Sequence, residues 1–314
     1  MNKTNQKLIN FTVDADHTEQ RVDNFLFSKF RKVPKSLIYR MLRKGAIRVN
    51  KKRAKPEYKL QNGDLIRLPH IETDITVTDK KPSDQAIKIL EKGILYEDEN
   101  LLVLNKPAGM ASHGGSGITF GVIETMREAR PQTKSLELVH RLDKDTSGCL
   151  ILAKKRSILK ELHELLRASN IKKKYLVLVK GKWQGGVRKV DVALIKNQLK
   201  SGERMVVADE TGKKSLTTFR PRQIFSMASL LEVDLGTGRT HQIRVHATHI
   251  GHPIAGDEKY GDKQFNSIMH KKGLKRLFLH AASLSIYLPS KEKTITVKAP
   301  LPKELDEILN TIDS

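Results

Sequence analysis

Residues 139–153 read VHRLDKDTSGCLILA, a dense run of charges that passes directly into an apolar segment. The part CLILA has the length and composition of a buried strand, and the residues DTSG before it favour a turn. We therefore expect a buried strand that follows a charged turn. Asp143 lies in that turn, where it is either an ordinary turn residue or a carboxylate held in place for chemistry.

Similar apolar segments recur through the rest of the chain, with few helical patterns between them. Ser157 is a candidate N-cap for a helix that buries Ile158, Leu162 and Leu165. Because βαβ alternation is rare, we expect a mixed, mostly antiparallel α+β domain over residues 91–314. Its other expected strands are NLLVLNKPAG (100–109), KYLVLVKG (174–181), SLLEVDLG (229–236), RLFLHAASLSIYL (276–288) and TITVKAP (294–300).

Residues 14–70 have the pattern of a separate, small α+β module. A first helix is indicated by apolar residues at helical spacing, which are Val22, Phe25, Leu26 and Phe30. A second helix is expected to open at Ser36 as N-cap and to stop at Gly45. The strand AIRVN follows, and the turn QNGD leads into the strand LIRLP. Residues 71–90 lose periodicity and are expected to form a linker.

Positive charge is concentrated in this first module. The chain has 58 Lys and Arg against 35 Asp and Glu, a net charge of +23, and residues 1–70 alone hold 17 against 6. Such a surface favours RNA backbone through the release of phosphate counterions, although a solvated helix face or an anionic lipid surface is the plainer alternative. The candidate RNA-binding residues are Lys35, Arg40, Arg43, Lys44, Arg48, Lys51, Lys52 and Arg53.

Several other chemistries and locations lack their signals. The segment HGGSGITFG has no Lys and Ser/Thr of a phosphate-binding P-loop, and HRLD is not followed by the other kinase motifs. The histidines of THQIRVHATHIG fit a helix capped by Thr240, with His246 near its buried face, better than a metal site. With one cysteine, Cys149, and no apolar run that could span a membrane, we expect a cytoplasmic protein without metal. We also expect a monomer, although no sequence pattern determines the oligomeric state.

Three polar residues beside apolar strands remain as candidates for chemistry. Asp143 lies in a turn, Tyr175 opens the strand KYLVLV, and Arg244 lies in the first turns of the helix after GTGRTHQ. Each alone also has an ordinary explanation, as a turn residue, a core-edge residue or an ion-pair partner. Spacing in the sequence does not establish that the three meet.

Longer motifs carry a resemblance to a known family. HRLDKDTSG, then KKYLVLV, then GTGRTHQIRVH…GHPIAGD…YG resemble the RluA-type pseudouridine synthases, and LVLNKPAGMASHGG is similar to the strand that precedes them there. The N-terminal module resembles the S4-type RNA-binding domain of many members. The resemblance covers nearly the whole chain.

The resemblance implies roles for single residues. Asp143 matches the catalytic aspartate, Tyr175 the active-site tyrosine, and Arg244 the arginine that pairs with the aspartate. Arg141 matches the residue that fills the space left by the flipped base. Isomerising uridine to pseudouridine imports no group and oxidises nothing, so we expect no cofactor.

The target is a further expectation. The segments VPKSLIYRMLRKGAIRVNKKRAKPEYKL and HGGSGITFGVIE most resemble members that act on large-subunit ribosomal RNA. This implies that 23S ribosomal RNA is the partner, with more than one uridine modified. A synthase with another target such as transfer RNA, and a non-catalytic RNA-binding or ribosome-assembly protein, are the alternatives.

Overall fold

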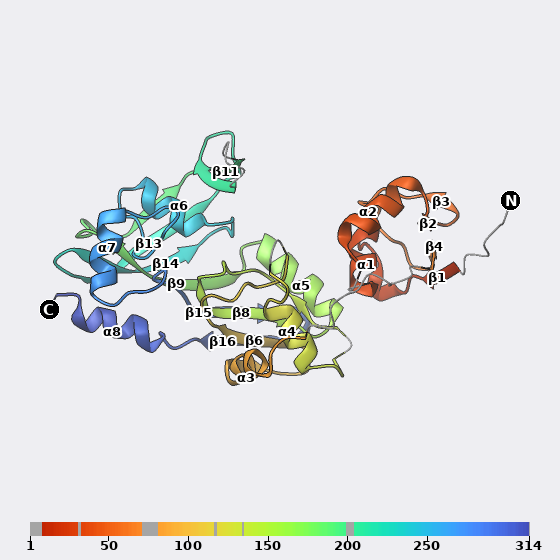
Figure 1. Ribbon diagram of the computed structural model, residues 1–314, viewed down its shortest axis with the longest axis horizontal. Coiled ribbons are helices and arrows are strands. Elements are labelled where there is room, and N and C mark those ends of the chain that lie inside the picture. Colours follow the sequence, from red (N-terminus) through yellow and green to blue (C-terminus); the bar gives the residue numbers. More distant parts are fainter. Residues whose placement is uncertain are drawn as a thin grey trace. The chain divides into compact units, whose positions relative to one another are not determined.

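The computed structural model describes residues 8–30, 33–70, 81–115, 118–133, 135–198 and 204–313. The chain forms two compact units, Met1–Lys81 and Pro82–Ser314 (Figure 1). Within the described ranges, no helix combines the length and the apolar character that a membrane span requires.

The first unit is a four-stranded sheet covered by two helices. Its strand order is β1-β4-β2-β3, formed by Leu8–Thr12, Leu65–Pro69, Arg48–Val49 and Lys52–Arg53. Helices α1 (Val22–Lys29) and α2 (Lys35–Lys44) share one apolar core with the sheet, which includes the fully buried Leu26, Ile38 and Ile66. The short 3-10 helix η1 (Ala15–His17) precedes α1. The α+β module expected from the sequence is confirmed, and β1 lies ahead of the range 14–70 that was expected for it.

Helix α2 starts two residues earlier than expected. Pro34 is at its N-cap, so Ser36 lies inside the first turn and does not cap the helix. Pro34 stands in an extended conformation with φ −55° and ψ 133°, and proline suits such a position because it needs no donor there. The stop at Gly45 is confirmed, since this residue adopts φ 71°.

The expectation of a linker over residues 71–90 is wrong for its second half. Helix α3 spans Asp84–Lys92, and the Ser83 side chain accepts a hydrogen bond from the Ala86 N–H at its start. Leu90 of this helix is fully buried in the core of the second unit. The short helix was missed because a single buried leucine gives little periodic signal. Residues 71–80 lie outside the described part of the chain.

The second unit is built on a large mixed sheet (Figure 1). Its main strand order is β10-β13-β14-β9-β15-β8-β6-β5, with β16 paired to β15 and β7 paired to β8. Among the described strands of this sheet, the β15–β8 pair is parallel and the others are antiparallel. The strands are β5 (Ile94–Glu97), β6 (Leu101–Lys106), β7 (Glu137–Leu138), β8 (Ser147–Ala153), β9 (Ile171–Lys180), β10 (Arg188–Asp191), β13 (Leu216–Ile224), β14 (Ala228–Leu235), β15 (Leu279–Leu288) and β16 (Lys293–Lys298).

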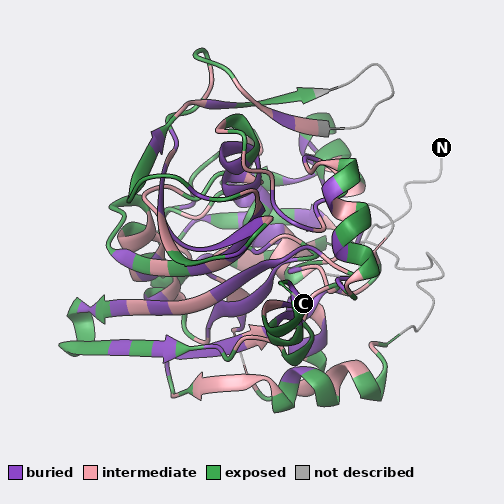
Figure 2. Ribbon diagram, turned by 90° about the vertical axis from the view of Figure 1, so that its left-hand side faces the viewer, coloured by how far each residue is buried: buried purple, intermediate pink, exposed green. Residues whose placement is uncertain are grey.

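Both faces of this sheet are packed. Alternate strand residues belong to different cores: Leu102 and Leu150 join α4 (Val122–Ala129) and α6 (Gln242–His249), whereas Ile151 joins α5 (Arg156–Arg167). The second of these faces is also covered by α7 (Lys263–Lys271) and α8 (Lys303–Thr311), which pack on Leu230. Figure 2 shows the buried strands between the partly exposed helices. The 3-10 helix η2 (Pro289–Lys291) joins β15 to β16, and a separate hairpin, β11 (Leu194–Gln198) and β12 (Arg204–Ala208), contacts α6.

Two helix starts in this unit differ from expectation. Lys155, not Ser157, is at the N-cap of α5, and His241, not Thr240, is at the N-cap of α6. Neither cap residue makes a side-chain cap hydrogen bond. His241 adopts φ 55°, a left-handed conformation that is uncommon outside glycine and often occurs at functional sites.

The parallel contact between β8 and β15 fixes the strand that follows Asp143. Gly148 pairs with Ala281 and adopts φ 107°. A Cβ on Gly148 would lie 2.3 Å from the Ala281 carbonyl oxygen, closer than any side chain tolerates. Glycine is therefore required where the charged turn enters the sheet.

Candidate active site

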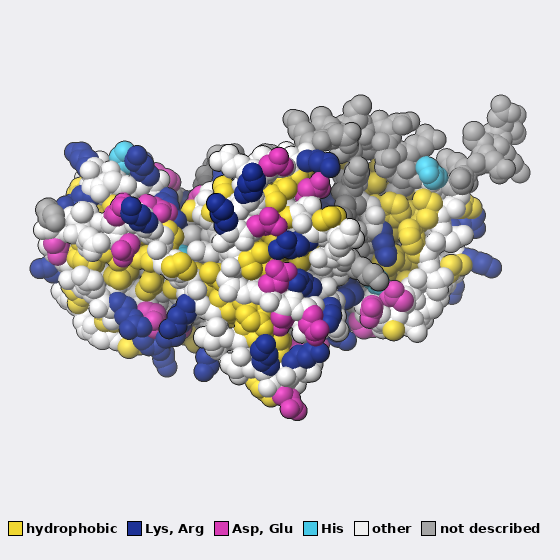
Figure 3. Space-filling model, turned by 90° about the horizontal axis from the view of Figure 1, so that it is seen from below, with side chains coloured by type: hydrophobic (Ala, Val, Ile, Leu, Met, Phe, Trp, Pro, Cys, Tyr) yellow, Lys and Arg dark blue, Asp and Glu magenta, His cyan; other side chains and the backbone are white. Residues whose placement is uncertain are grey.

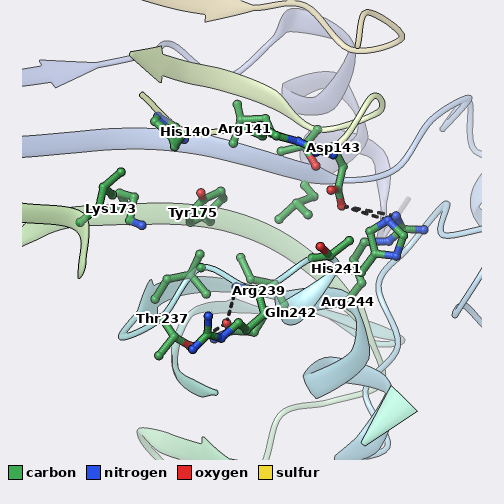
Figure 4. A pocket seen from close by; sticks show the side chains of 18 of the residues that line it. His140, Arg141, Asp143, Lys173, Tyr175, Thr237, Arg239, His241, Gln242 and Arg244 are labelled. Carbon is green, nitrogen blue, oxygen red and sulfur yellow. Dashed lines mark hydrogen bonds and ion pairs between the residues drawn. The ribbon is translucent and has the colours of Figure 1, made fainter. Parts of the chain in front are cut away.

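A cavity of about 680 Å³ opens at the sheet face that carries Tyr175 and α6 (Figure 4). Asp143, Tyr175 and Arg244 all line it, and so does Arg141. The structure thus brings together residues from a turn, a central strand and a helix that are far apart in the sequence. Their positions in the sequence alone did not establish that Asp143, Tyr175 and Arg244 lie close together.

The turn that carries Asp143 is anchored on both sides of this residue. The Leu142 backbone bonds the Ser112 hydroxyl in both directions, since Ser112 Oγ donates to the Leu142 oxygen at 2.7 Å and accepts from its N–H at 3.0 Å. On the other side, Lys106 Nζ donates to the Lys144 oxygen at 2.9 Å. Asp143 itself keeps 27% of its side chain exposed to the cavity. Its backbone is therefore fixed while its carboxylate stays accessible.

Lys106 is an unusual anchor because it is a fully buried amine. It also donates to the carbonyl oxygens of Pro107 and Met110, at 2.8 and 2.6 Å. Burial lowers the pKa of Lys106 to about 7, against a partial opposing effect of Asp145. Its hydrogen bonds tie the segment after β6 to the turn that carries Asp143.

Arg244 lies between two carboxylates. Its Nη1 is 3.5 Å from Asp143 Oδ2, while its Nε and Nη2 each donate to Asp257 at 2.7 Å in a bidentate pair. The Asp257 side chain is 1% exposed. Burial works to raise the pKa of Asp257, but hydrogen bonds and charge from Arg244 outweigh it and the pKa is lowered. The expected contact of Arg244 with Asp143 is present, yet Asp257 is its tighter partner.

Tyr175 and Arg141 contribute different surfaces to the cavity. Tyr175 is 6% exposed, and burial, with a smaller contribution from the Asp143 charge, raises its pKa, so the phenol stays neutral at neutral pH. Arg141 is exposed at the rim. A neutral ring in the wall and an exposed cation at the opening suit a planar base and the space that it vacates.

His241 also faces Asp143, which the sequence did not indicate. Its Nε2 lies 3.8 Å from Asp143 Oδ2, and its Nδ1 is 2.8 Å from the Tyr260 hydroxyl. Asp257 and Tyr260 belong to the segments GHPIAGD and YG quoted above, so their motif was noticed while their contacts were not. Lys106 and Ser112 were missed in the same way, inside LVLNKPAGMASHGG.

His246 is a structural residue. It is fully buried, and its two ring nitrogens lie 2.9 Å from Thr217 Oγ1 and 2.9 Å from the Val192 carbonyl oxygen. Its expected place on the buried face of α6 is confirmed. Across the described residues, no group of three or more His, Cys, Asp or Glu is arranged to hold a metal ion.

The basic residues of the first unit are available to a ligand. All eight candidate RNA-binding residues there are exposed, and they lie on α2 and around the β2–β3 hairpin. None of the eight pairs with a carboxylate within the described part of the chain. Their charge is therefore not neutralised locally.

Comparisons with known proteins agree with this architecture. A family model for RNA pseudouridylate synthase matches residues 100–249, and a model of the S4 domain matches residues 20–66. The chain is 51% identical to a ribosomal large subunit pseudouridine synthase C from Pasteurella multocida, over 99% of this chain and 97% of that one. It is 49% identical to the protein of the same name from Escherichia coli, over 96% and 95% of the two chains. The solved structure named "Human RNA Pseudouridylate Synthase Domain Containing 4" is also similar. The match covers 73% of this chain and 97% of that one, at 27% identity and a TM-score of 0.60.

An S4 domain followed by this sheet and cavity defines a class of RNA-modifying isomerases. The chain belongs to the RNA pseudouridylate synthase family, as the resemblance to the RluA-type enzymes predicted. It is an RNA pseudouridine synthase with an N-terminal RNA-binding domain.

Proposed function

We propose that this enzyme isomerises several uridines of large-subunit (23S) ribosomal RNA to pseudouridine, as a cytoplasmic monomer that needs neither metal nor cofactor. The supporting observation is that Asp143, Arg244 and Tyr175 line one cavity in a chain about half identical, along almost its full length, to large-subunit synthases. A non-catalytic RNA-binding protein has no use for this carboxylate, which supports the catalytic proposal over that alternative.

The reaction breaks the N1–C1′ bond, turns the uracil and joins C5 to C1′. C5 loses its proton and N1 gains one, so the product is an isomer of uridine. In this reaction Asp143 acts either as a nucleophile at C1′ or as a base that takes a proton from the ribose, and both routes need an ionised carboxylate. The guanidinium of Arg244 lies 3.5 Å from the Asp143 carboxylate and places a positive charge beside it. The neutral ring of Tyr175 stacks on the detached uracil, or helps to remove the C5 proton.

A uridine in a stem does not reach Asp143 unless it leaves the stack. Flipping a nucleotide costs a few kcal/mol, roughly, which binding must supply. Arg141 at the rim is placed to fill the gap that the base leaves. The eight basic residues of the S4 domain then hold RNA backbone away from the target uridine, which gives affinity with little sequence information.

The test is a carbodiimide-based pseudouridine map of RNA from a strain that lacks this gene. We expect signals to disappear at more than one position of large-subunit ribosomal RNA and to return with the wild-type gene but not with Asp143→Ala. Signals lost from transfer RNA, with ribosomal RNA unchanged, would contradict the proposed target.

A further inference from the structure

His241 lies between the catalytic turn and a buried tyrosine. One ring nitrogen, Nε2, is 3.8 Å from Asp143 Oδ2, and the other, Nδ1, is 2.8 Å from the Tyr260 hydroxyl. Figure 4 shows the ring on the same side of the Asp143 carboxylate as Arg244. The backbone of His241 adopts φ 55°, a left-handed conformation that is uncommon for residues other than glycine and clusters at functional sites.

The tyrosine that contacts this ring is itself fixed. The Val206 N–H of β12 donates to the Tyr260 hydroxyl oxygen at 2.9 Å. The Tyr260 N–H donates to Asp257 Oδ1 at 3.0 Å, and the Tyr260 ring packs in a small core with Leu194 and Val245. Only 9% of Tyr260 is exposed.

These contacts determine where the protons lie. Because the Tyr260 oxygen already accepts the Val206 N–H, its own proton needs an acceptor, and His241 Nδ1 is within reach at 2.8 Å. If Nδ1 carried a proton instead, the buried phenol proton would be unpaired, which disfavours that tautomer by roughly tenfold or more. The neutral ring then carries its proton on Nε2, the nitrogen that faces Asp143.

The ring is neutral at neutral pH. Burial is the main cause that lowers the pKa of His241, and the positive charges of Arg244 and Lys259 lower it further. The charges of Asp143 and Asp257 act in the opposite direction without reversing the result. An uncharged N–H donor can thus face Asp143 without forming a second ion pair there.

We propose that Tyr260 holds His241 as its Nε2–H tautomer and that His241 presents this N–H to the Asp143 carboxylate as a second donor beside Arg244. The proposal rests on the catalytic role proposed for Asp143. The 3.8 Å separation is longer than a hydrogen bond, so the N–H acts on Asp143 as an oriented dipole and bonds it after a shift of about 1 Å. His241 is a positioning residue in this account, and Tyr260 positions it in turn.

Two substitutions of His241 distinguish the roles of its two ring nitrogens. Glutamine places an amide N–H near the position of Nε2, whereas asparagine is too short and reaches only the position of Nδ1. Asparagine suits the left-handed backbone better than glutamine does. If the backbone conformation decides activity, His241→Asn should be the more active variant. If the donor at Nε2 decides it, His241→Gln should be the more active variant.

In the full-length protein, kcat should depend on whether the variant keeps an N–H donor at the position of Nε2. We expect His241→Asn to lower kcat by about tenfold or more and His241→Gln to retain clearly more turnover, with RNA binding equal in both. His249→Asn, an exposed position on the same helix, is the control for a change of kcat unrelated to the site. Equal losses in the two variants, or better activity with asparagine, would overturn the proposal.

The tautomer is measured directly by ¹⁵N NMR of protein labelled at its histidine ring nitrogens, with His241 assigned by its loss in His241→Gln. We expect a single Nε2–H tautomer in the wild type and a mixture in Tyr260→Phe. A wild-type Nδ1–H tautomer would refute the proposal even if the enzyme is active. An enzyme with the expected tautomer that forms no pseudouridine would instead contradict the proposed function.

Discussion

Replacing Arg244 by methionine should affect stability and activity through two different carboxylates. Arg244 makes a bidentate pair with Asp257, whose side chain is 1% exposed, and a looser contact with Asp143 at 3.5 Å. Removing one partner of a buried pair leaves an uncompensated charge, which costs about 3–5 kcal/mol. For a domain of this size each kcal/mol lowers Tm by about 2–4 °C, so we expect Arg244→Met to lose roughly 6–20 °C.

The loss of Tm in Arg244→Met should depend on pH in a defined direction. In the wild type the pKa of Asp257 is lowered, so this residue contributes stability that is present above its unfolded pKa and is lost as pH falls toward the folded pKa. Without Arg244, burial raises the pKa of Asp257 against only the backbone N–H groups of Lys259 and Tyr260, so this pKa rises relative to the wild type. The variant therefore lacks much of the stability that the wild type gains as pH rises through the pKa of Asp257. The difference in Tm between wild type and variant should therefore shrink on acidification.

A second variant separates folding from catalysis. In Arg244→Met/Asp257→Asn the amide removes the buried charge and can still accept the N–H groups of Lys259 and Tyr260, which Asp257 Oδ1 accepts at 3.0 Å each. We expect the double variant to recover most of the lost Tm while pseudouridine formation stays low, because Asp143 still lacks its counter-charge. Calorimetric scans at several pH values and tritium release from 5-³H-uridine RNA measure the two effects. Recovery of both stability and turnover would refute a role of Arg244 at Asp143.

Two further substitutions and one deletion test other parts of the account. Tyr175→Phe keeps the ring and removes the hydroxyl, and we expect kcat to fall by about 10²-fold if the phenol transfers a proton; near-normal turnover would leave stacking as its only role. Gly148→Ala should destabilise the protein by about 2–4 kcal/mol, since its Cβ would meet the Ala281 carbonyl at 2.3 Å, and an unchanged urea midpoint would contradict this packing. Deleting residues 1–80 should weaken binding to ribosomal RNA and reduce its salt dependence, and an unchanged salt slope would place the phosphate contacts elsewhere.

The sequence predicted those parts of the fold that depend on local pattern. Apolar segments, continuous or alternating, identified β6, β8, β9, β14, β15 and β16, and Gly45 marked the end of α2. Helix starts were less predictable: Pro34, Lys155 and His241 stand at N-caps without a side-chain cap bond, so the usual serine or threonine signal pointed to neighbouring residues. Helices α4, α7 and α8 were not foreseen either, because each buries only one narrow apolar face against the sheet.

The candidate site was predictable in its residue types and not in its contacts. Asp143, Tyr175 and Arg244 stand in recognisable motifs, and the structure places all three on one cavity. No local pattern reveals that Arg244 binds Asp257 more closely than Asp143, because that depends on where α6 ends relative to the loop after it. The left-handed backbone of His241 and the burial of Lys106 likewise follow from tertiary packing.

The most direct test of the central claim is Asp143→Ala. Because Arg244 keeps its bidentate pair with Asp257 and Asp143 is 27% exposed, the structure predicts a stability loss below about 1 kcal/mol. Thermal unfolding, binding to an rRNA fragment and tritium release from 5-³H-uridine RNA should be measured on one preparation. We expect a folded protein that binds RNA within a few-fold of wild type and releases no tritium above background. Measurable release by the folded Asp143→Ala protein would contradict the assignment of Asp143 as the catalytic carboxylate.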